Sequence, residues 1–530
     1  MHSCNIITIV VDDLGWADLG CFGSSFYETP NIDHLAKMGT RFTDAYASCP
    51  VCSPTRASLL TGQYPARIGL TQFIGGHLVG HLQDVPYFNR LPLQLRTLPE
   101  ALRDGGYQTW HVGKWHLGEG TSLPDRRGFD INLGGCGWGL PKHGYFSPYG
   151  CPTLSDGPDG EYLTDRLTDE SLRLIDERDT ARPFFLNLCH YAVHTPLQAP
   201  APLVEKYRAK ADRLGLDPYP LAPPEAHPCY GHRHEVYEIR RRRYQSHPIY
   251  AAMIEALDSS IGRLVGHLAQ RDLLEQTMII VTSDNGGLAT TEGSPTCNAP
   301  LSEGKGWMYE GGNRISQIIS WPGHLPVNRT CSIPTTTTDI YPTCLDAAGL
   351  PLEPHHHRDG VSLLPILRPP TNDPQQLDRD AIFWHYPHYS NQGGAPAAAV
   401  RHGDHKLIEH FEDGRLELFD LRQDPGEHDD LSMREPQLRK RLRCTAGSWT
   451  GSGSSPHRSP RSIPTGDRWR TIPAAIPRRC SCAPSTSRDR CPPAACRGKE
   501  PDGCRSSPRL TSLTHLRPRS AAHCQHRIPA

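Results

Sequence analysis

Two pairs of acidic or amide side chains follow apolar segments of the chain. Asp12 and Asp13 come after one such segment, and Asp284 and Asn285 come after another. Ligands of open α/β sheets bind beyond the carboxyl ends of the strands, so two central parallel strands would bring all four side chains to one edge. Their oxygen atoms suit Ca²⁺ or Mg²⁺ better than zinc. The simpler alternative is that each pair caps a turn or the next helix, a common use of Asp and Asn.

The segment from Cys49 to Cys52 is a CxxC motif with three interpretations. A zinc site would need a second pair of ligands at a suitable spacing, and no convincing pair is present. A redox pair would open a helix and lower the pKa of a thiol. In the third interpretation, Pro54 lies in the first turn of a helix that runs through Leu60. Cys52 would then lie at the positive end of that helix, where an anion is favoured, with Arg56 on the same helix.

Several basic side chains could complete an anion site around these groups. Lys114 and His116 follow one expected strand, His194 lies just beyond another, and Lys305 stands between two glycines. Each of them alone is better explained as a surface lysine or a structural histidine. Together with Arg56 they could line a cationic pocket around the acidic pairs. A metal ion with Arg, Lys and His donors is what an oxyanion such as sulfate or phosphate would need.

Residues 1–350 alternate short apolar segments with amphipathic ones, which predicts an α/β catalytic domain. We expect a large mixed, mainly parallel sheet flanked by helices. The expected strands are Asn5–Val11, Gln108–Val112, Pro183–Leu188, Met278–Thr282 and Ile315–Ser320. The expected helices are Asn31–Met38, Leu98–Asp104, Thr164–Glu177 and Ile249–Gln270.

Residues 351–443 carry shorter alternating segments, which predict a small C-terminal subdomain. Ala399–Ile408 and Arg415–Asp420 suit an antiparallel sheet, closed by a helix near 433–443. Between the elements, loops rich in Gly, Pro and His are expected at 71–96, 115–160 and 211–247. Loops of this length are usually functional or disordered, but no motif in them identifies a substrate.

Residues 444–530 differ sharply from the rest of the chain. They contain 14 Arg and 1 Lys against 4 acidic residues, and 7 of the 18 Cys. Such a composition cannot bury enough apolar surface to offset chain entropy, which predicts disorder. A basic arm for nucleic acid or an acidic polymer is one interpretation. We prefer a frameshift, because the character changes abruptly after Arg443, and the coding DNA would settle it.

The overall composition excludes several classes of protein. With 56 Lys+Arg against 57 Asp+Glu, the net charge of −1 gives no general reason to expect nucleic-acid or membrane-surface binding. No segment approaches the roughly 20 apolar residues that a membrane-spanning helix requires. The chain starts without the features of a signal peptide. We therefore expect a cytoplasmic protein, or a periplasmic or secreted one if the true N-terminus is missing.

In its motifs the chain resembles the type I, formylglycine-dependent sulfatases of the alkaline-phosphatase superfamily, and within that family the arylsulfatase branch. The signature is Cys52-Ser53-Pro54-Thr55-Arg56, followed by Leu60-Thr61-Gly62. Supporting segments are Val11–Gly15, Thr29–Asp33, Val112–Gly118, Thr282–Gly286, Gly304–Gly306, Glu310–Gly312, Trp321–Gly323, His405–Ile408, Asp420–Leu421 and Asp424–Glu427. The resemblance covers 5–443 and implies an alkaline-phosphatase-like fold.

The resemblance also implies a modified nucleophile and a bound cation. Cys52 would be oxidised to formylglycine (3-oxoalanine) by a formylglycine-generating or sulfatase-maturing enzyme and then hydrated to a diol. Asp12, Asp13, Asp284 and Asn285, with an oxygen of the modified Cys52, would hold a divalent cation, usually Ca²⁺ and alternatively Mg²⁺. The substrate would be a sulfated small molecule or a sulfated glycan.

The same resemblance assigns roles to the basic residues. Arg56 and Lys114 would orient and stabilise the diol, and His116 would take the proton that triggers release of sulfate. His194 and Lys305 would bind sulfate oxygens, and one of them would protonate the leaving alcohol.

Three points weigh against this interpretation or qualify it. A phosphatase or phosphodiesterase of the same superfamily would have Ser or Thr in place of Cys52. A catalytically inactive or damaged homologue would explain the unusual tail. After Gly312 the chain keeps Arg314 but not the Glu-Pro that usually follows in the family, which we expect to loosen packing behind Lys305.

The basic run Arg240–Arg243 is better explained as a solvated helix face than as a nucleic-acid patch.

Overall fold

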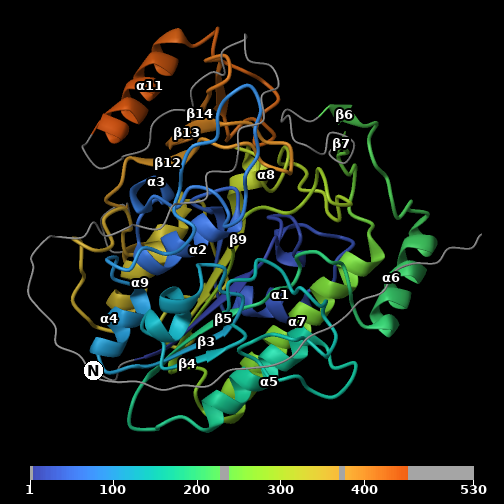
Figure 1. Ribbon diagram of the computed structural model, residues 1–530, viewed down its shortest axis with the longest axis vertical. Coiled ribbons are helices and arrows are strands. Elements are labelled where there is room, and N and C mark those ends of the chain that lie inside the picture. The colour runs from blue at the N-terminus through green and yellow to red at the C-terminus, as the bar shows by residue number, and fades with distance from the viewer. Residues whose placement is uncertain (1–3, 227–237, 369–376, 452–530) are drawn as a thin grey trace, which may run out of the picture. The chain divides into compact units, whose positions relative to one another are not determined.

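A nine-stranded sheet forms the centre of the computed structural model, which describes residues 4–226, 238–368 and 377–451 (Figure 1). In spatial order its strands are β10 (Arg329–Cys331), β2 (Gly39–Tyr46), β9 (Arg314–Ser320), β8 (Thr277–Ser283), β1 (Asn5–Val11), β5 (Phe184–Cys189), β3 (Gln108–Gly113) and β4 (Ile131–Leu133), and β11 (Thr335–Thr336) also pairs with β2. β9 runs antiparallel to both of its neighbours, and the other pairings in this sheet are parallel. The predicted mixed, mainly parallel sheet is confirmed.

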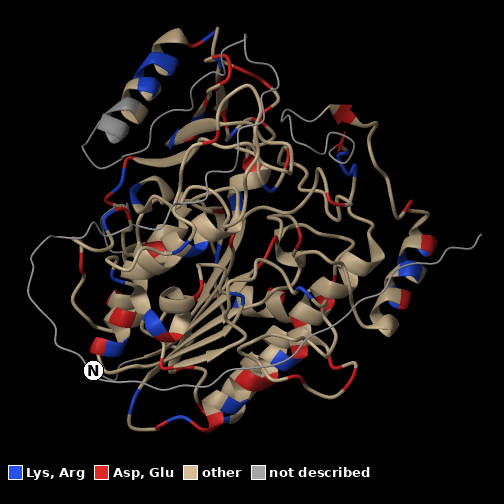
Figure 2. Cartoon of the chain, in the orientation of Figure 1, with Lys and Arg blue, Asp and Glu red and all other residues tan. Residues whose placement is uncertain are grey.

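The central strand β1 shows why this sheet is buried on both faces. Ile7, Ile9 and Val11 enter one apolar cluster, whereas Ile6 and Val10 enter a second cluster on the opposite face. A strand covered on both faces is expected to be continuously apolar rather than alternating. Figure 2 shows the central strands almost free of charged residues, with Lys, Arg, Asp and Glu on the surrounding helices and loops.

Helices cover the two faces of the sheet. One apolar cluster includes side chains of α1 (Pro30–Lys37), α5 (Leu163–Asp176), α6 (Ala201–Leu214) and α7 (Pro248–Gln270). The opposite cluster includes side chains of α2 (Cys52–Thr61), α3 (Pro65–Ile68), α4 (Leu98–Asp104), α9 (Ile340–Ala347) and α10 (Leu364–Leu367). Short 3₁₀ turns lie at Gly20–Phe22, Gly120–Ser122, Pro124–Arg126 and Thr337–Asp339.

The strands and helices predicted within residues 1–350 are all present, with ends that differ by one residue at most. The sequence pattern missed β2, which lies between β9 and β10. Its register against β9 is irregular between Phe42 and Ala45, and this interrupts the alternation by which a strand is recognised. The pattern also missed α6 and α9.

A second, four-stranded antiparallel sheet follows in the chain, as predicted. Its strands, in order, are β12 (Ala381–Tyr386), β13 (Ala397–His402), β14 (His405–His410) and β15 (Leu416–Asp420). The segment Ala399–Ile408, expected as one alternating unit, spans two strands, because Gly403 takes a left-handed φ of 60° and turns the chain.

The last described helix, α11 (Pro436–Gly451), is the predicted closing helix. It packs on the second sheet through Leu442, with Leu438 and Ala446 partly buried. The helix continues past Arg443 and ends at Gly451, which is the last residue described. The predicted disorder and the frameshift hypothesis concern residues that, from 452 onward, lie outside the described part of the chain. The boundaries expected at 350 and 443 stay predictions.

The basic run 240–243 is not on a helix, so the prediction that it forms a solvated helix face is wrong. Arg240 follows β7 (Glu238–Ile239), which pairs with β6 (Glu225–Ala226). Its backbone N–H donates to Thr290 O at 2.8 Å, and Arg242 is buried. The run therefore supports a loop instead of lying on an exposed helix.

Within the described residues, no helix is both long and apolar enough to cross a membrane.

Candidate functional site

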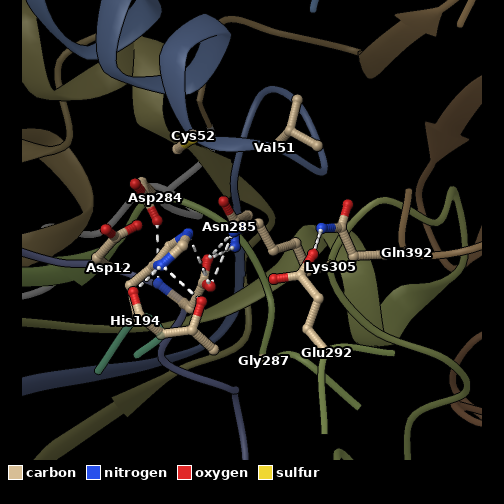
Figure 3. A network of polar contacts seen from close by, with 12 residues as sticks. Asp12, Val51, Cys52, His194, Asp284, Asn285, Gly287, Glu292, Lys305 and Gln392 are labelled. Atoms are coloured by element: carbon tan, nitrogen blue, oxygen red, sulfur yellow. Dashed lines mark hydrogen bonds and ion pairs between the residues drawn. The ribbon is translucent and has the colours of Figure 1, made fainter. Parts of the chain in front are cut away.

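Two neighbouring parallel strands carry the acidic pairs to the same edge of the sheet. β1 and β8 pair in register from Asn5 opposite Thr277 to Val11 opposite Ser283. The four residues that follow these strands, Asp12, Asp13, Asp284 and Asn285, are therefore neighbours, and all are at most 1% exposed. Figure 3 shows Asp12, Asp284 and Asn285 gathered at this edge.

Hydrogen bonds join the two pairs. The backbone N–H of Asp13 donates to Asp284 Oδ1 at 3.3 Å, and Asn285 Nδ2 donates to Asp13 Oδ1 at 2.9 Å. Asp13 has a left-handed φ of 61°, which is uncommon for a residue other than glycine. The expectation that these side chains meet is fulfilled in the fold.

Buried basic side chains pair with the three carboxylates. The pairs are Lys114 with Asp12 at 2.5 Å, Lys305 with Asp13 at 2.8 Å, and Arg56 with Asp284 at 2.8 Å. Every member of these pairs is buried. Three acids and three bases cancel in formal charge, so the protein groups alone give the site no net charge with which to attract an anion.

Two oxygen atoms of the cluster accept no hydrogen bond, although Arg56 lies 3.9 Å from one of them, Asp12 Oδ1. Asp12 Oδ1 and Asn285 Oδ1 are buried and receive no hydrogen bond from any described residue. Leaving a buried polar atom unpaired costs about 1–3 kcal/mol, so these positions are unfavourable unless another group binds there. Carboxylate and amide oxygens are hard ligands. The donor set therefore fits a divalent cation such as Ca²⁺.

Electrostatics distinguish the two adjacent aspartates. Burial raises the pKa of Asp12 well above its usual value, with repulsion from Asp284 and Asp13 adding to the effect of burial. For Asp13, burial acts in the same direction, but Lys305, His194 and Lys114 together outweigh it and lower the pKa. A cation bound beside Asp12 would favour its ionised form.

Extension of the pairing beyond β5 brings His194 to the site. Val193 N donates to Asp12 O at 2.8 Å, directly before the histidine. His194 Nε2 then lies 3.7 Å from Asp13 Oδ2. One ligand atom each of Asp12, Asp13 and His194 lie within 4.8 Å of one another. Burial and the nearby Lys305 lower the pKa of His194 to about 3, so its imidazole is neutral near pH 7.

Cys52 is the first residue of α2, and Pro54 lies in the first turn, as the third interpretation of the CxxC motif predicts. Its Sγ lies 3.3 Å from His116 Nδ1. Burial raises the pKa of the Cys52 thiol, against the opposing effect of Lys114. A raised pKa is the reverse of what a redox-active thiol needs.

The second sheet helps to position Cys52. Val51 and Cys49, just before α2, belong to the apolar cluster that covers one face of this sheet. Trp384 in β12 donates from Nε1 to Ala47 O at 2.8 Å. The turn that precedes α2 is thus held between the two sheets.

His116 is held in a strained and crowded position. Its φ is 55°, and its Nε2 lies 3.3 Å from Ile74 O. Burial and the charge of Lys114 lower the pKa of His116 well below its usual value. A Cβ atom on Gly139 would lie 2.6 Å from the His116 ring, so a larger residue there would displace the ring. The neutral imidazole beside Cys52 can accept a proton at Nδ1.

All ten residues singled out from the sequence therefore lie in one buried network. Arg314, expected to mark looser packing, pairs with Asp44 at 3.0 Å and donates from Nε to Thr43 O at 2.7 Å. Sequence reasoning missed Glu292 and Gln392, which lie beside Lys305 in Figure 3. Neither belongs to a motif, and only the fold brings them to the site.

Sequence comparisons give one consistent result. A family profile described as Sulfatase matches residues 4–350, and one described as N-sulphoglucosamine sulphohydrolase, C-terminal, matches 304–443. A sulfatase of Formosa agariphila is 31% identical, with 82% of this chain and 85% of that protein covered. Arylsulfatase A of Homo sapiens is also 31% identical, with 82% of this chain and 80% of that protein covered.

Comparison of folds agrees. The crystal structure of Ps i-CgsB in complex with k-i-k-neocarrahexaose matches with a TM-score of 0.67 and 29% identity. The match covers 86% of this chain and 94% of that one. The phosphonate monoester hydrolase of Agrobacterium radiobacter, at a TM-score of 0.59 and 20% identity, shares the fold.

Proposed function

The chain belongs to the sulfatase family and is a sulfuric ester hydrolase, and from this premise we propose that it cleaves sulfate monoesters with a formylglycine made from Cys52 beside a bound divalent cation. One observation carries the proposal. Cys52 lies at the N-terminus of α2, 3.3 Å from the neutral His116, in the same network as the buried acids.

Asp12, Asp13, Asp284 and Asn285 would hold the cation. The unpaired Oδ1 atoms of Asp12 and Asn285 support this assignment. When bound, the cation supplies positive charge that attracts a sulfate oxygen and lowers the pKa of a hydroxyl group next to it. It would also convert a site with no net formal charge into one that favours an anion.

The basic residues would divide the remaining work. His116 Nδ1 faces residue 52 and would accept a proton from the hydrated side chain, because its lowered pKa leaves it neutral. Lys114 and Arg56 hold the acids and would orient residue 52. Lys305 and His194 both face Asp13 and would bind sulfate oxygens, with one of them protonating the leaving alcohol.

The substrate would be a sulfated glycan or a sulfated small molecule. The hexasaccharide bound to Ps i-CgsB supports a glycan, and the similarity to arylsulfatase A supports a small aryl ester.

A mass spectrum of the tryptic peptide Phe42–Arg56, from protein made in its own host, tests the nucleophile. Formylglycine at Cys52 is the expected result. An unmodified thiol, or a disulfide between Cys49 and Cys52, would overturn the proposal.

Paired substrates test the reaction. Turnover of 4-nitrophenyl sulfate should exceed turnover of 4-nitrophenyl phosphate, and EDTA should abolish it until Ca²⁺ or Mg²⁺ is returned. A preference for the phosphate ester would instead favour a phosphatase of the same superfamily.

A further inference from the structure

A carboxylate with no part in the mechanism above lies beside Lys305. Figure 3 shows Glu292 and Gln392 beside Lys305, on the side away from Asp12. Glu292 is exposed, whereas Lys305 is 3% exposed. The charge of Glu292 is among those that raise the pKa of Lys305, with Asp13 contributing most. Glu292 thus lies where the exterior meets the buried network.

Two amide groups hold one oxygen of this carboxylate. Asn391 Nδ2 and Gln392 Nε2 both donate to Glu292 Oε1 at 2.6 Å. Gln392 is buried, and its own Oε1 accepts a hydrogen bond from Ser390 at 2.6 Å. In the described part of the chain, no group donates a hydrogen bond to Glu292 Oε2. The carboxylate is therefore fixed through one oxygen and open at the other.

The turn that presents Glu292 has an unfavourable backbone. Glu292 and Ser294 have left-handed φ values of 53° and 43°, and Gly293 lies between them at 88°. Left-handed φ at residues other than glycine costs on the order of 1 kcal/mol each and persists only where the surroundings enforce it. Such positions are most common at functional sites.

The surroundings here do enforce it. Ser294 Oγ donates to Arg240 O at 2.6 Å, and the buried Arg242 donates to Ser294 O. On the other side, Thr290 Oγ1 donates to Gln392 O at 2.7 Å. The basic run 240–243 and the segment around Gln392 thus clamp the turn from two directions, which leaves Glu292 in one position.

We propose that Glu292 is a specificity-determining residue whose free oxygen accepts hydrogen bonds from hydroxyl groups of the leaving alcohol, so that neutral sugars carrying a single sulfate are preferred substrates. This inference rests on the proposed function. Hydrogen bonds to an ionised acceptor are about twice as strong as neutral ones. The same charge repels a leaving group that carries a second sulfate or a carboxylate.

The substitution Glu292→Gln isolates this role. Glutamine keeps an oxygen for Asn391 and Gln392, but it places an NH₂ group where Oε2 stands and removes the charge. We expect kcat/KM for galactose 6-sulfate to fall about 10-fold or more, the effect of losing one charged hydrogen bond. For 4-nitrophenyl sulfate, whose ring has no hydroxyl group, the change should stay within about twofold. Discrimination against a disulfated galactose should weaken.

Glu238→Gln is the matched control. Glu238 is exposed, pairs with Arg240 at 2.6 Å, and should leave both kcat/KM values unchanged. An equal loss on both substrates in Glu292→Gln, or no loss on either, would overturn the inference. So would a wild-type enzyme that cleaves the aryl sulfate but none of a panel of hexose 6-sulfates.

A binding measurement separates this inference from the proposed function. Calorimetry with galactose 6-sulfate on the inactive Cys52→Ala variant requires no turnover. Adding Glu292→Gln to that variant should raise the Kd for galactose 6-sulfate about 10-fold, and an unchanged Kd would overturn the inference. A wild-type enzyme inert on every sulfate ester would instead overturn the proposed function, and the inference with it.

Discussion

Two clusters of buried charge lie in the described part of the molecule, and they differ in how completely their atoms are paired. The site cluster consists of Asp12, Asp13, Asp284, Asn285, Arg56, Lys114 and Lys305. The second, which we term the clamp cluster, consists of Asp44, Tyr46, Glu310, Arg314, Arg401, Lys406 and Glu427. It joins the central sheet to the four-stranded sheet.

The clamp cluster leaves neither oxygen of its central acid unpaired. Lys406 Nζ lies 2.9 Å from both Glu310 Oε1 and Glu427 Oε1. Glu310 Oε2 accepts a hydrogen bond from Tyr46 at 2.7 Å, and Arg314 lies 3.4 Å from the same oxygen. Glu427 Oε1 accepts no hydrogen bond, but the ammonium of Lys406 lies against it. In the site cluster, by contrast, Asn285 Oδ1 accepts no hydrogen bond, and Asp12 Oδ1 has only Arg56 at 3.9 Å. Buried charge with complete partners serves the fold, whereas buried charge with unpaired oxygens marks a place for a ligand.

The largest effect should come from Cys52→Ala, which separates chemistry from stability. Loss of the nucleophile should lower kcat on 4-nitrophenyl sulfate on the order of 10⁴-fold or more, with little change in Tm. Cys49→Ala is the matched control, because Cys49 is also a buried free thiol of the same motif. It should keep most of the activity. Equal losses in the two variants would favour the redox interpretation.

Removing one lysine from each cluster should show whether the clusters differ in kind. Lys406→Met leaves Glu310 and Glu427 buried without their cation, which should cost about 3–5 kcal/mol of unfolding free energy. Turnover per folded molecule should hardly change. Lys114→Met removes the partner of Asp12 and should also destabilise the metal-free protein, although a cation can take its place.

Thermal unfolding with and without Ca²⁺ checks this prediction. Ca²⁺ should restore much of the stability of Lys114→Met, since a ligand at 100 times its Kd contributes about 2.7 kcal/mol. The ion should not rescue Lys406→Met beyond the shift seen for the wild-type protein. Equal rescue of the two variants would remove the distinction between the clusters.

A smaller effect should appear in the pH dependence of stability. Burial, only partly offset by Lys406, raises the pKa of Glu427 to about 7 from the usual 4.5. Between these pH values the folded chain holds a proton that the unfolded chain releases. The unfolding free energy should therefore fall as the pH rises through this window, by up to about 3 kcal/mol, and stay level above it.

Urea unfolding at pH 5, 6, 7 and 8 measures this slope. Glu427→Gln cannot titrate and should show a flatter profile than the wild-type protein. Parallel profiles would mean that Glu427 does not carry the proton.

The smallest effect should come from charges outside both clusters. Arg240 is exposed and pairs with Glu238 at 2.6 Å, and exposed ion pairs are worth about 0–1 kcal/mol. Arg240→Ala should leave turnover unchanged and shift the unfolding free energy by less than about 1 kcal/mol. A large loss of activity would show that the conformation of the Glu292 turn depends on the Arg240 side chain.

Much of the fold follows from local patterns. The strands β1, β5 and β8 are mostly apolar and buried throughout, and the long helix α7 buries Met253, Leu257 and Ile261 on one face as its periodicity predicts. β2 could not be recognised, because its irregular pairing with β9 breaks the alternation. Its place in the sheet depends on a partner strand about 270 residues away in the chain.

Position at strand ends, the CxxC motif and the glycine-flanked Lys305 were enough to single out the residues of the network, because parallel strands bring their carboxyl ends to one edge. Only the tertiary structure decided how those residues pair and which oxygens stay unpaired. The same is true of Glu292, which meets Gln392 across 100 residues of chain, and of Glu310, Lys406 and Glu427, which form a clamp rather than a site. A sequence shows which chemical groups are present and where local structure sends them. Pairing between distant groups is set by packing. Packing decides whether a buried charged group finds all its partners within the protein or is fully paired only when a ligand binds.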